Sequence, residues 1–232
     1  IPVTSFFRDA TAFDSLCDTV MEKIVPGKSP ENPLRIWIAG CSTGQEAYSI
    51  AICLHEYLEK NKLSVKVQIF ATDLSEKAIK KARSGVYLKN EMSGISGEQL
   101  QKYFKNHDKA YQPIKVIRDM CIFARHNFLT DPPFVKVDLI TCRNVLIYLE
   151  PYLQKKALET FHYALNGQNE AADRQGILWL GKSETTGNAS DLFIPMGKKE
   201  KFYLRKTVSS KIQIRTISGR KAITAMIAPS WF

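Results

Sequence analysis

Apolar residues in the first third of the chain form two short runs, each followed by a segment with helical spacing. Residues 34–39 are almost wholly apolar and end before Gly40, and apolar positions then recur every three or four residues from 45 to 59. Residues 65–71 alternate between apolar and polar side chains, and a second helical pattern covers 75–84. This order of strand, helix, strand and helix predicts a parallel sheet covered by helices.

The same alternation returns in the second half of the chain. Residues 137–142 are typical of a buried strand, a helix is predicted over 151–165, and 176–181 is predicted to be another strand. The closing segments 192–196 and 201–205 are predicted to form an antiparallel hairpin. We therefore predict an α/β fold with a mostly parallel sheet, helices on both faces and an antiparallel hairpin at the end.

The segment 86–126 interrupts this pattern. Residues 96–105 have helical spacing, whereas 113–126 is predicted to form two short strands that turn near Arg118 and Asp119. We interpret the segment as a small β excursion inserted into the main sheet.

The composition excludes several classes of protein. Of the 232 residues, 44% are hydrophobic, which is enough for a folded core and argues against wholesale disorder. No apolar stretch reaches the roughly 18 residues that cross a bilayer, so we expect no membrane insertion. The five cysteines include no C-x-x-C pair, which favours a reducing, cytoplasmic location and argues against a metal site. No basic-then-apolar leader follows Ile1, so we expect no signal peptide and a piece of a longer protein.

The net charge leaves the class of partner open. The formal charge of +10 is compatible with nucleic acid, an anionic membrane surface or an acidic protein. Part of the excess is local, because five bases and one acid lie within 198–206. Residues 207–232 contain bases but no acid, and we predict a basic tail or linker there.

Two features predict a nucleoside site at the carboxyl ends of the first two strands. The loop Ala39–Gly44 is rich in small residues and precedes a helix, whose first N–H groups are free to bind a ligand. Asp73 follows the second strand, where an acid can accept both hydroxyls of a ribose, although it can also simply cap a helix. The loop has neither G-x-G-x-x-G nor the lysine of a phosphate-binding loop, since Gly44 is followed by Gln45. S-adenosylmethionine, which carries adenosine but no phosphate, fits such a loop.

The same loop also matches the serine-hydrolase pattern G-x-S-x-G, with Ser42 as the nucleophile. A triad needs a downstream histidine on a loop, and the late histidine, His162, lies inside the predicted helix over 151–165. We therefore disfavour a hydrolase.

Six blocks of the sequence, in order along the chain, resemble those of one known family. They are Val3–Asp9, Trp37–Ser49, Phe70–Asp73, Ala82–Tyr87, Asn127–Leu129 and Cys142–Tyr148, and the last, C-R-N-V-L-I-Y, is highly specific. The family is that of the CheR-type chemoreceptor glutamate methyltransferases. The resemblance implies a Rossmann-like class I methyltransferase domain over residues 1–206, using S-adenosylmethionine, with a small helix/β-subdomain inserted at about 86–126.

The resemblance also implies roles for single residues. Those expected to contact the cofactor are Thr4, Arg8, Ala39, Gly40, Glu46, Asp73, Asn127, Phe128, Asn144 and Val145, and the expected catalytic residues are Arg8 and Tyr148. Within this set, Asp73 is expected to hold the ribose, Asn127 the adenine edge and Glu46 the amino group of the methionine part. The alternatives are structural: Arg8 could form a surface ion pair, and Tyr148 could pack on the sheet.

The implied reaction is methyl transfer to a glutamate side chain of a chemoreceptor, with S-adenosylhomocysteine as the product. The implied partners are acidic helical segments of chemoreceptors or related signalling proteins, rather than nucleic acid. In some members of the family the β-subdomain binds a receptor's C-terminal peptide, which makes such a peptide a further candidate partner.

Three departures from the family's pattern support an alternative. Pro2 stands where the family usually has Asn, Gln45 replaces the first of two acids, and the helical domain that usually precedes the first block is not in this sequence. The alternative is a cofactor-binding regulatory module of a larger signalling protein, with little or no methyl transfer. A nucleic-acid methyltransferase ranks third, because no aromatic and basic stacking motif is present.

Overall fold

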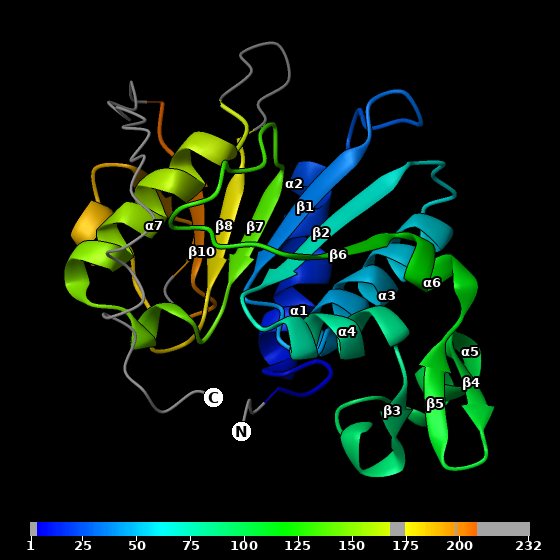
Figure 1. The fold of residues 1–232 in the computed structure, drawn as a ribbon. Helices are drawn as coiled ribbons and strands as arrows, with labels where there is room; N and C mark the ends of the chain where they lie inside the picture. The colour runs from blue at the N-terminus through cyan, green and yellow to red at the C-terminus, as the bar shows by residue number, and fades with distance from the viewer. Residues whose placement is uncertain (1–3, 168–174, 198, 208–232) are drawn as a thin grey trace.

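The computed structural model describes residues 4–167, 175–197 and 199–207, and within them a seven-stranded sheet forms the centre of the fold (Figure 1). The strand order is β6-β2-β1-β7-β8-β10-β9. The strands are β1 (Leu34–Ala39), β2 (Val67–Asp73), β6 (Cys121–Arg125), β7 (Leu139–Cys142), β8 (Ile177–Leu180), β9 (Phe193–Pro195) and β10 (Phe202–Arg205).

The strand directions confirm the predicted α/β fold. The five strands from β6 to β8 are parallel, β10 runs antiparallel to β8, and β9 pairs antiparallel with β10 as the predicted hairpin. The chain builds outward from β1 through β2 to β6 and then returns to the other side of β1 with β7. Such a reversal creates a crevice at the carboxyl ends of β1 and β7, where open α/β sheets bind ligands.

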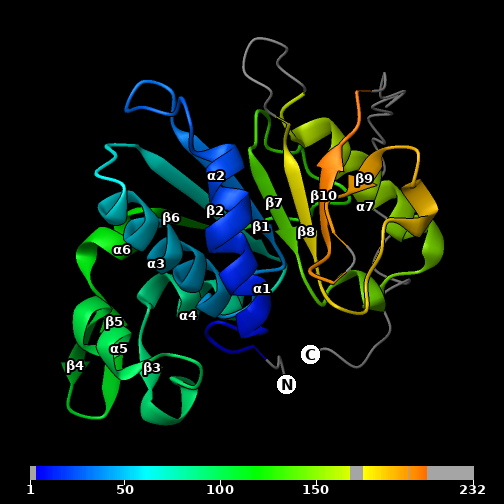
Figure 2. The same ribbon diagram turned by 180° about the vertical axis from the view of Figure 1, so that it is seen from behind.

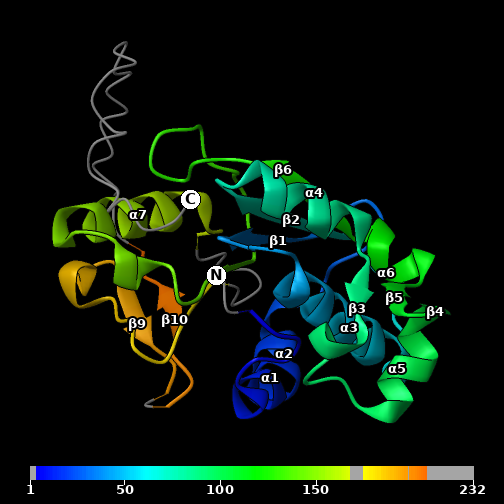
Figure 3. The ribbon, with the colours of Figure 1, turned by 60° about the horizontal axis from the view of Figure 1, so that its bottom comes forward.

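Helices cover both faces of the sheet (Figures 2 and 3). One face carries a continuous helical segment and the two crossover helices, and the other face carries α7. The helices are α1 (Ala10–Ser15), the π-helical turn η1 (Leu16–Val20), α2 (Met21–Ile24), α3 (Gln45–Lys60), α4 (Glu76–Ser84) and α7 (Pro151–Ala164), with short 3-10 turns η3 (Leu146–Tyr148) and η4 (Gly187–Ala189).

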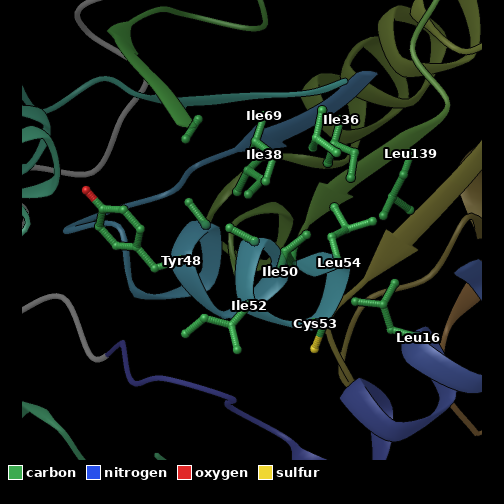
Figure 4. Close-up of a cluster of buried hydrophobic side chains, with 14 of the residues drawn as sticks. Leu16, Ile36, Ile38, Tyr48, Ile50, Ile52, Cys53, Leu54, Ile69 and Leu139 are labelled. Carbon is green, nitrogen blue, oxygen red and sulfur yellow. The ribbon is translucent and has the colours of Figure 1, made fainter. Parts of the chain in front are cut away.

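The alternation of side chains along β1 explains the two layers. Ile36 and Ile38 belong to the core on the α3 side, whereas Trp37 packs with Phe161 of α7 on the opposite side. On α3, Leu54 faces the sheet together with its neighbours at helical spacing (Figure 4). Both faces of the central strands are therefore buried, as parallel strands require.

Local signals set the ends of the second crossover helix. Ser75 is the N-cap of α4, and its hydroxyl oxygen accepts a hydrogen bond from the Ala78 N–H at 3.2 Å. Gly85 ends the helix with a φ of 63°, a conformation that glycine adopts without strain. Both ends agree with the sequence prediction for 75–84.

The inserted segment forms a second, three-stranded sheet with the order β3-β5-β4. Its elements are β3 (Tyr87–Leu88), the 3-10 turn η2 (Lys89–Glu91), α5 (Gly97–Tyr103), β4 (Phe104–His107) and β5 (Ala110–Pro113). Figure 1 shows this sheet beyond the β6 edge of the main sheet, below α6 (Lys115–Asp119). Its separate β-structure thus covers residues 87–113.

Of the two short strands predicted over 113–126, the second is confirmed and the first is wrong. Lys115–Asp119 forms the helix α6, in which Ile117 is fully buried, and Cys121–Arg125 forms β6 of the main sheet. An apolar run this short fits a helix and a strand equally well. The parallel pairing of Cys121 with Ile69 of β2 decides the outcome, and this partner lies 52 positions away in the sequence. The predicted basic tail over 207–232 lies outside the described residues, except for Thr207.

No helix in the part of the chain that the structure describes has the length and apolar character needed to cross a membrane.

The packing of α3 generates a stability prediction. Leu54 has no exposed surface, so Leu54→Ala should lower the free energy of unfolding by about 2–5 kcal/mol, since it leaves a cavity against the sheet. Leu63→Ala is the control, because this leucine is 44% exposed and should change the same quantity by about 0.5 kcal/mol or less. Urea unfolding measures both, and equal effects would contradict the proposed packing.

Candidate functional site

The carboxyl ends of four neighbouring strands bring most of the predicted site residues to one edge of the sheet. Strand β2 ends at Asp73, and the strands β6, β1 and β7 are followed by residues 126–128, 40–44 and 143–145, respectively. The register places Asp73 opposite Arg125 and Ala39 opposite Thr72, so the loops start side by side (Figure 1). This edge includes the crevice between β1 and β7.

Two glycines allow the loop between β1 and α3 to lie close to its neighbours. Gly40 and Gly44 have φ values of 87° and 94°, which side chains other than glycine rarely adopt. The N–H groups of Gly40 and Cys41 both donate to the Thr72 carbonyl at 2.8 Å. A Cβ atom on Gly40 would lie 2.4 Å from Cγ2 of Val145, so the loop after β7 packs directly on this glycine.

The carboxylate of Asp73 accepts hydrogen bonds from two neighbouring loops. Its Oδ1 accepts from the Ser75 N–H at 2.9 Å, and its Oδ2 accepts from the Ser42 N–H at 2.8 Å. Each carboxylate oxygen can accept a second hydrogen bond, so the group still fits the hydroxyls of a ribose. The buried Ser42 hydroxyl has no partner among the described residues. The loop therefore fits a polar ligand such as the adenosine part of S-adenosylmethionine.

A buried arginine that the sequence analysis did not select lies at the centre of the site. The side chain of Arg143 is 2% exposed, and its Nη1 donates to Glu46 Oε2 at 3.1 Å. Its Nη2 donates to Asp9 Oδ2 at 2.8 Å and to the Arg8 carbonyl at 2.9 Å. The second oxygen of Glu46 accepts from the Thr141 hydroxyl at 2.6 Å. The signal for Arg143 was its place inside the block Cys142–Tyr148.

This network brings the first motif of the chain to the sheet edge. Partial burial favours the neutral form of Asp9, but the hydrogen bond from Lys182 and the charge of Arg143 together hold the pKa of Asp9 below its usual value. The carboxylate is therefore ionised at neutral pH and fixes the start of α1 against β7. Arg8 is half-buried beside it.

The second residue that sequence analysis missed is Glu184. It is 3% exposed and accepts hydrogen bonds from the backbone N–H groups of Asn144, Val145, Leu146 and Gly181. Its signal in the sequence was weak, being a single acid three residues after the glycine that ends the predicted strand over 176–181.

The remaining predicted residues lie near the same edge in less defined positions. Asn127 Oδ1 accepts from the Leu129 N–H at 3.0 Å, and its amide nitrogen has no partner in the described part of the chain. Phe128 is 8% exposed, and its ring packs 5.5 Å from that of Phe161, so its side chain belongs to the core. Thr4 is half-buried, and Tyr148 is 57% exposed in η3. Their proposed contacts with the cofactor or the methyl group stay predictions.

The geometry contradicts the hydrolase alternative. His162 lies in α7, where its Nε2 hydrogen bonds with the Lys206 carbonyl at 2.9 Å. The Ser42 hydroxyl has no histidine partner within the described residues. The pair of nucleophile and base that a triad requires is therefore not formed.

A doubly wound parallel sheet, a glycine-rich loop after its first strand and an acid after its second define the cofactor-binding domain of a class I methyltransferase. The family model for the CheR methyltransferase, SAM binding domain, matches residues 2–202. The chain belongs to this family, and its cofactor is S-adenosylmethionine.

Several curated proteins are similar to this chain. It is 36% identical over 203 residues to an uncharacterised 104.1 kDa protein of Rhodobacter capsulatus, covering 88% of this chain and 21% of that protein. It is 34% identical over 187 residues to a chemotaxis protein methyltransferase of Borreliella burgdorferi, and the match covers 78% of this chain and 64% of that protein. It is also 35% identical over 193 residues to chemotaxis protein methyltransferase 1 of Pseudomonas aeruginosa, covering 81% and 68%. The chain thus spans less than two thirds of the first two relatives.

The contact between Gly40 and Val145 generates a binding prediction. Gly40→Ala should weaken the affinity for S-adenosylhomocysteine by about tenfold or more, because the new methyl group displaces the 143–145 loop and the φ is unfavourable for alanine. Gly97→Ala is the control, since no atom lies within 4 Å of the added Cβ. Isothermal titration calorimetry measures both variants, and an unchanged affinity in Gly40→Ala would refute the role of this contact.

Proposed function

We propose that this domain transfers a methyl group from S-adenosylmethionine to the side-chain carboxylate of a glutamate in a chemoreceptor or related signalling protein. The observation that carries the proposal is the convergence of Arg8, Glu46 and Asp73 at the edge of a CheR-family cofactor domain. The names of the relatives from Borreliella burgdorferi and Pseudomonas aeruginosa support the same reaction. When bound, S-adenosylmethionine supplies an electrophilic methyl group.

We assign the contacts with the cofactor to two carboxylates and one amide. We assign the ribose hydroxyls to Asp73, the adenine edge to Asn127 and the amino group of the methionine part to Glu46. Gly40 and Val145 pack directly against each other at the same edge of the sheet. Arg143 holds Glu46 in place by a charge-assisted hydrogen bond, which fixes the direction of its carboxylate.

The chemistry demands orientation more than proton transfer. A glutamate carboxylate is already ionised at neutral pH, so the acceptor needs no general base. Holding the two reacting groups in line contributes about 7–11 kcal/mol in favourable cases. We assign the orientation of the acceptor carboxylate to Arg8 and to Tyr148, whose side chain belongs to an exposed residue.

A basic cavity beside the network supports an acidic partner. It has a volume of about 440 Å³ and lies at the carboxyl end of β8, with Arg143 in its wall. Lys182, Lys199 and Lys201 line it together with two acids, and neither Lys199 nor Lys201 has an ion-pair partner among the described residues. Positive potential at this cavity would attract acidic helical segments. Chemoreceptor segments that present glutamates have this character, and we place the reaction in the cytoplasm.

The catalytic roles are tested by two variants and one control. Methyl transfer from labelled S-adenosylmethionine to receptor fragments should fall about a hundredfold in Arg8→Ala and about tenfold or more in Tyr148→Phe, because each removes a group that orients the acceptor. Tyr152→Phe is the control, since this tyrosine is 62% exposed four residues further along. Wild-type rates in both test variants would refute these roles.

The second candidate function is a cofactor-binding regulatory module. It is favoured by the relative from Rhodobacter capsulatus, in which the matching region makes up 21% of a much longer protein. A module of this kind would bind S-adenosylhomocysteine and transfer no methyl group to any acidic helical substrate. The labelled-cofactor assay on wild-type protein therefore separates the two functions.

We also propose that the three-stranded sheet binds a receptor's C-terminal peptide as an added strand. Its order, β3-β5-β4, leaves β3 and β4 as edge strands that can pair with an extended peptide.

The strand-addition proposal is tested with synthetic receptor tails. Calorimetry should detect binding of the unmodified peptide. Methylation of the alternate backbone nitrogens that face the edge strand should abolish binding, because strand addition depends on main-chain hydrogen bonds. The reference is the same peptide methylated on the other alternate set of nitrogens. Equal binding of all three peptides would contradict the added strand.

A further inference from the structure

A buried carboxylate outside the proposed reaction lies beneath the turn that follows β7. Glu184 Oε1 accepts from the N–H groups of Val145 at 2.8 Å and Leu146 at 2.7 Å, and Oε2 accepts from Asn144 at 2.9 Å and Gly181 at 2.6 Å. All four donors are backbone groups, and no cation forms an ion pair with Glu184 within the described residues. Peptide dipoles therefore compensate its charge.

The turn that Glu184 holds contains two of the predicted cofactor residues, and a candidate catalytic residue follows it. Asn144 and Val145 are predicted to contact S-adenosylmethionine, and the Tyr148 N–H donates to the Val145 carbonyl at 3.1 Å. The Val145 side chain also lies against Gly40. A shift of this turn would therefore change the cofactor loop and the direction of Tyr148 together.

The backbone of the turn needs an external anchor. Asn144 has a φ of 60°, in the left-handed region that residues other than glycine seldom occupy. Three successive N–H groups, from Asn144 to Leu146, converge on the same carboxylate, and such a nest fits an anion. The anchor supplied by the chain is the side chain of Glu184.

Gly181 provides the space that this arrangement requires. A Cβ atom at this position would lie 2.7 Å from Glu184 Oε2 and 2.8 Å from the Asn144 nitrogen. Any larger residue must push the carboxylate away from the turn. One glycine and one glutamate, both shortly after β8, therefore hold the turn that follows β7.

We propose that Glu184 is a positioning residue that sets the affinity for S-adenosylmethionine and the placement of Tyr148 by fixing the turn from Asn144 to Leu146. The effect on affinity requires only that the domain binds S-adenosylmethionine. The effect on turnover rests in addition on the function proposed above.

The variant Glu184→Gln tests the proposal with almost no change in size. The amide has one oxygen instead of two, so it can accept from only some of the four backbone N–H groups. Its NH₂ group would face the remaining N–H donors and repel them. We expect the affinity for S-adenosylhomocysteine to fall about tenfold or more in calorimetry, and kcat for methyl transfer to fall as well. Gly181→Ala should have the same effect while it leaves the charge in place. The double variant should bind S-adenosylhomocysteine no more weakly than the weaker-binding single variant, because both substitutions act on the same contact.

Asp138→Asn is the matched control. Asp138 is also a buried carboxylate, 6% exposed, but it lies at the opposite end of β7. It accepts from the Arg35 N–H at 2.9 Å and from Asn166 Nδ2 at 2.6 Å, and it pairs with Lys28 at 2.7 Å. This variant should lower the midpoint of urea unfolding while it changes the affinity for S-adenosylhomocysteine by about twofold or less.

The outcomes separate positioning from stability. If Glu184→Gln and Gly181→Ala lower the unfolding midpoint but keep wild-type affinity, or if Asp138→Asn loses affinity equally, Glu184 is only structural and the proposal is overturned. If Glu184→Gln does not fold, Gly181→Ala decides by the same criterion. Absence of methyl transfer in the wild type would refute the proposed function and leave the binding result intact, because calorimetry needs no acceptor.

Discussion

The site depends on the pairing of one buried cation, the guanidinium of Arg143. Its carbon lies 4.1 Å from the centre of the Trp179 ring, and its nitrogens reach Glu46 at the start of α3 and Asp9 at the start of α1. A buried charge that loses one partner typically destabilises a protein by about 3–5 kcal/mol. The guanidinium therefore brings the start of α1, the start of α3 and the carboxyl end of β7 together.

The residue after Arg143 begins the turn that Glu184 holds. The short segment from Arg143 to Leu146 is therefore fixed by a cation at its first residue and by the carboxylate of Glu184 along the turn. Arg143 is a side-chain cation bound by carboxylates from α1 and α3, whereas Glu184 is a side-chain anion bound by the turn's own N–H groups. The two interactions act on different groups and cannot substitute for each other. Together they leave the turn little freedom, and preorganisation of this kind reduces the conformational entropy that a ligand must remove on binding.

Local patterns made most of the fold predictable, and distant contacts account for what was missed. The loop after β1, the Ser75 cap and the hairpin at the end depend on residues close in sequence, so spacing and turn chemistry identify them. Strand β6 depends on its pairing with β2, and the hydrogen bond between Arg143 and Glu46 joins residues 97 positions apart. The cofactor loop and Asp73 are predictable from the sequence, whereas Arg143 and Glu184 are not, because a single charge has no periodicity that would identify its partner.

The carboxylates at the two edges of the sheet have different partners. At the amino end, the carboxylate of Asp138 contacts a lysine, an amide and a backbone N–H. At the carboxyl edge, Asp73 accepts only backbone N–H groups and keeps lone pairs, and the Ser42 hydroxyl has no partner among the described residues. Unsatisfied polar groups cost stability unless a ligand completes them. At the carboxyl edge these free acceptors and the Ser42 hydroxyl lie beside the crevice that the reversal of strand order creates, while Arg143 and Glu184 hold the surrounding backbone in place.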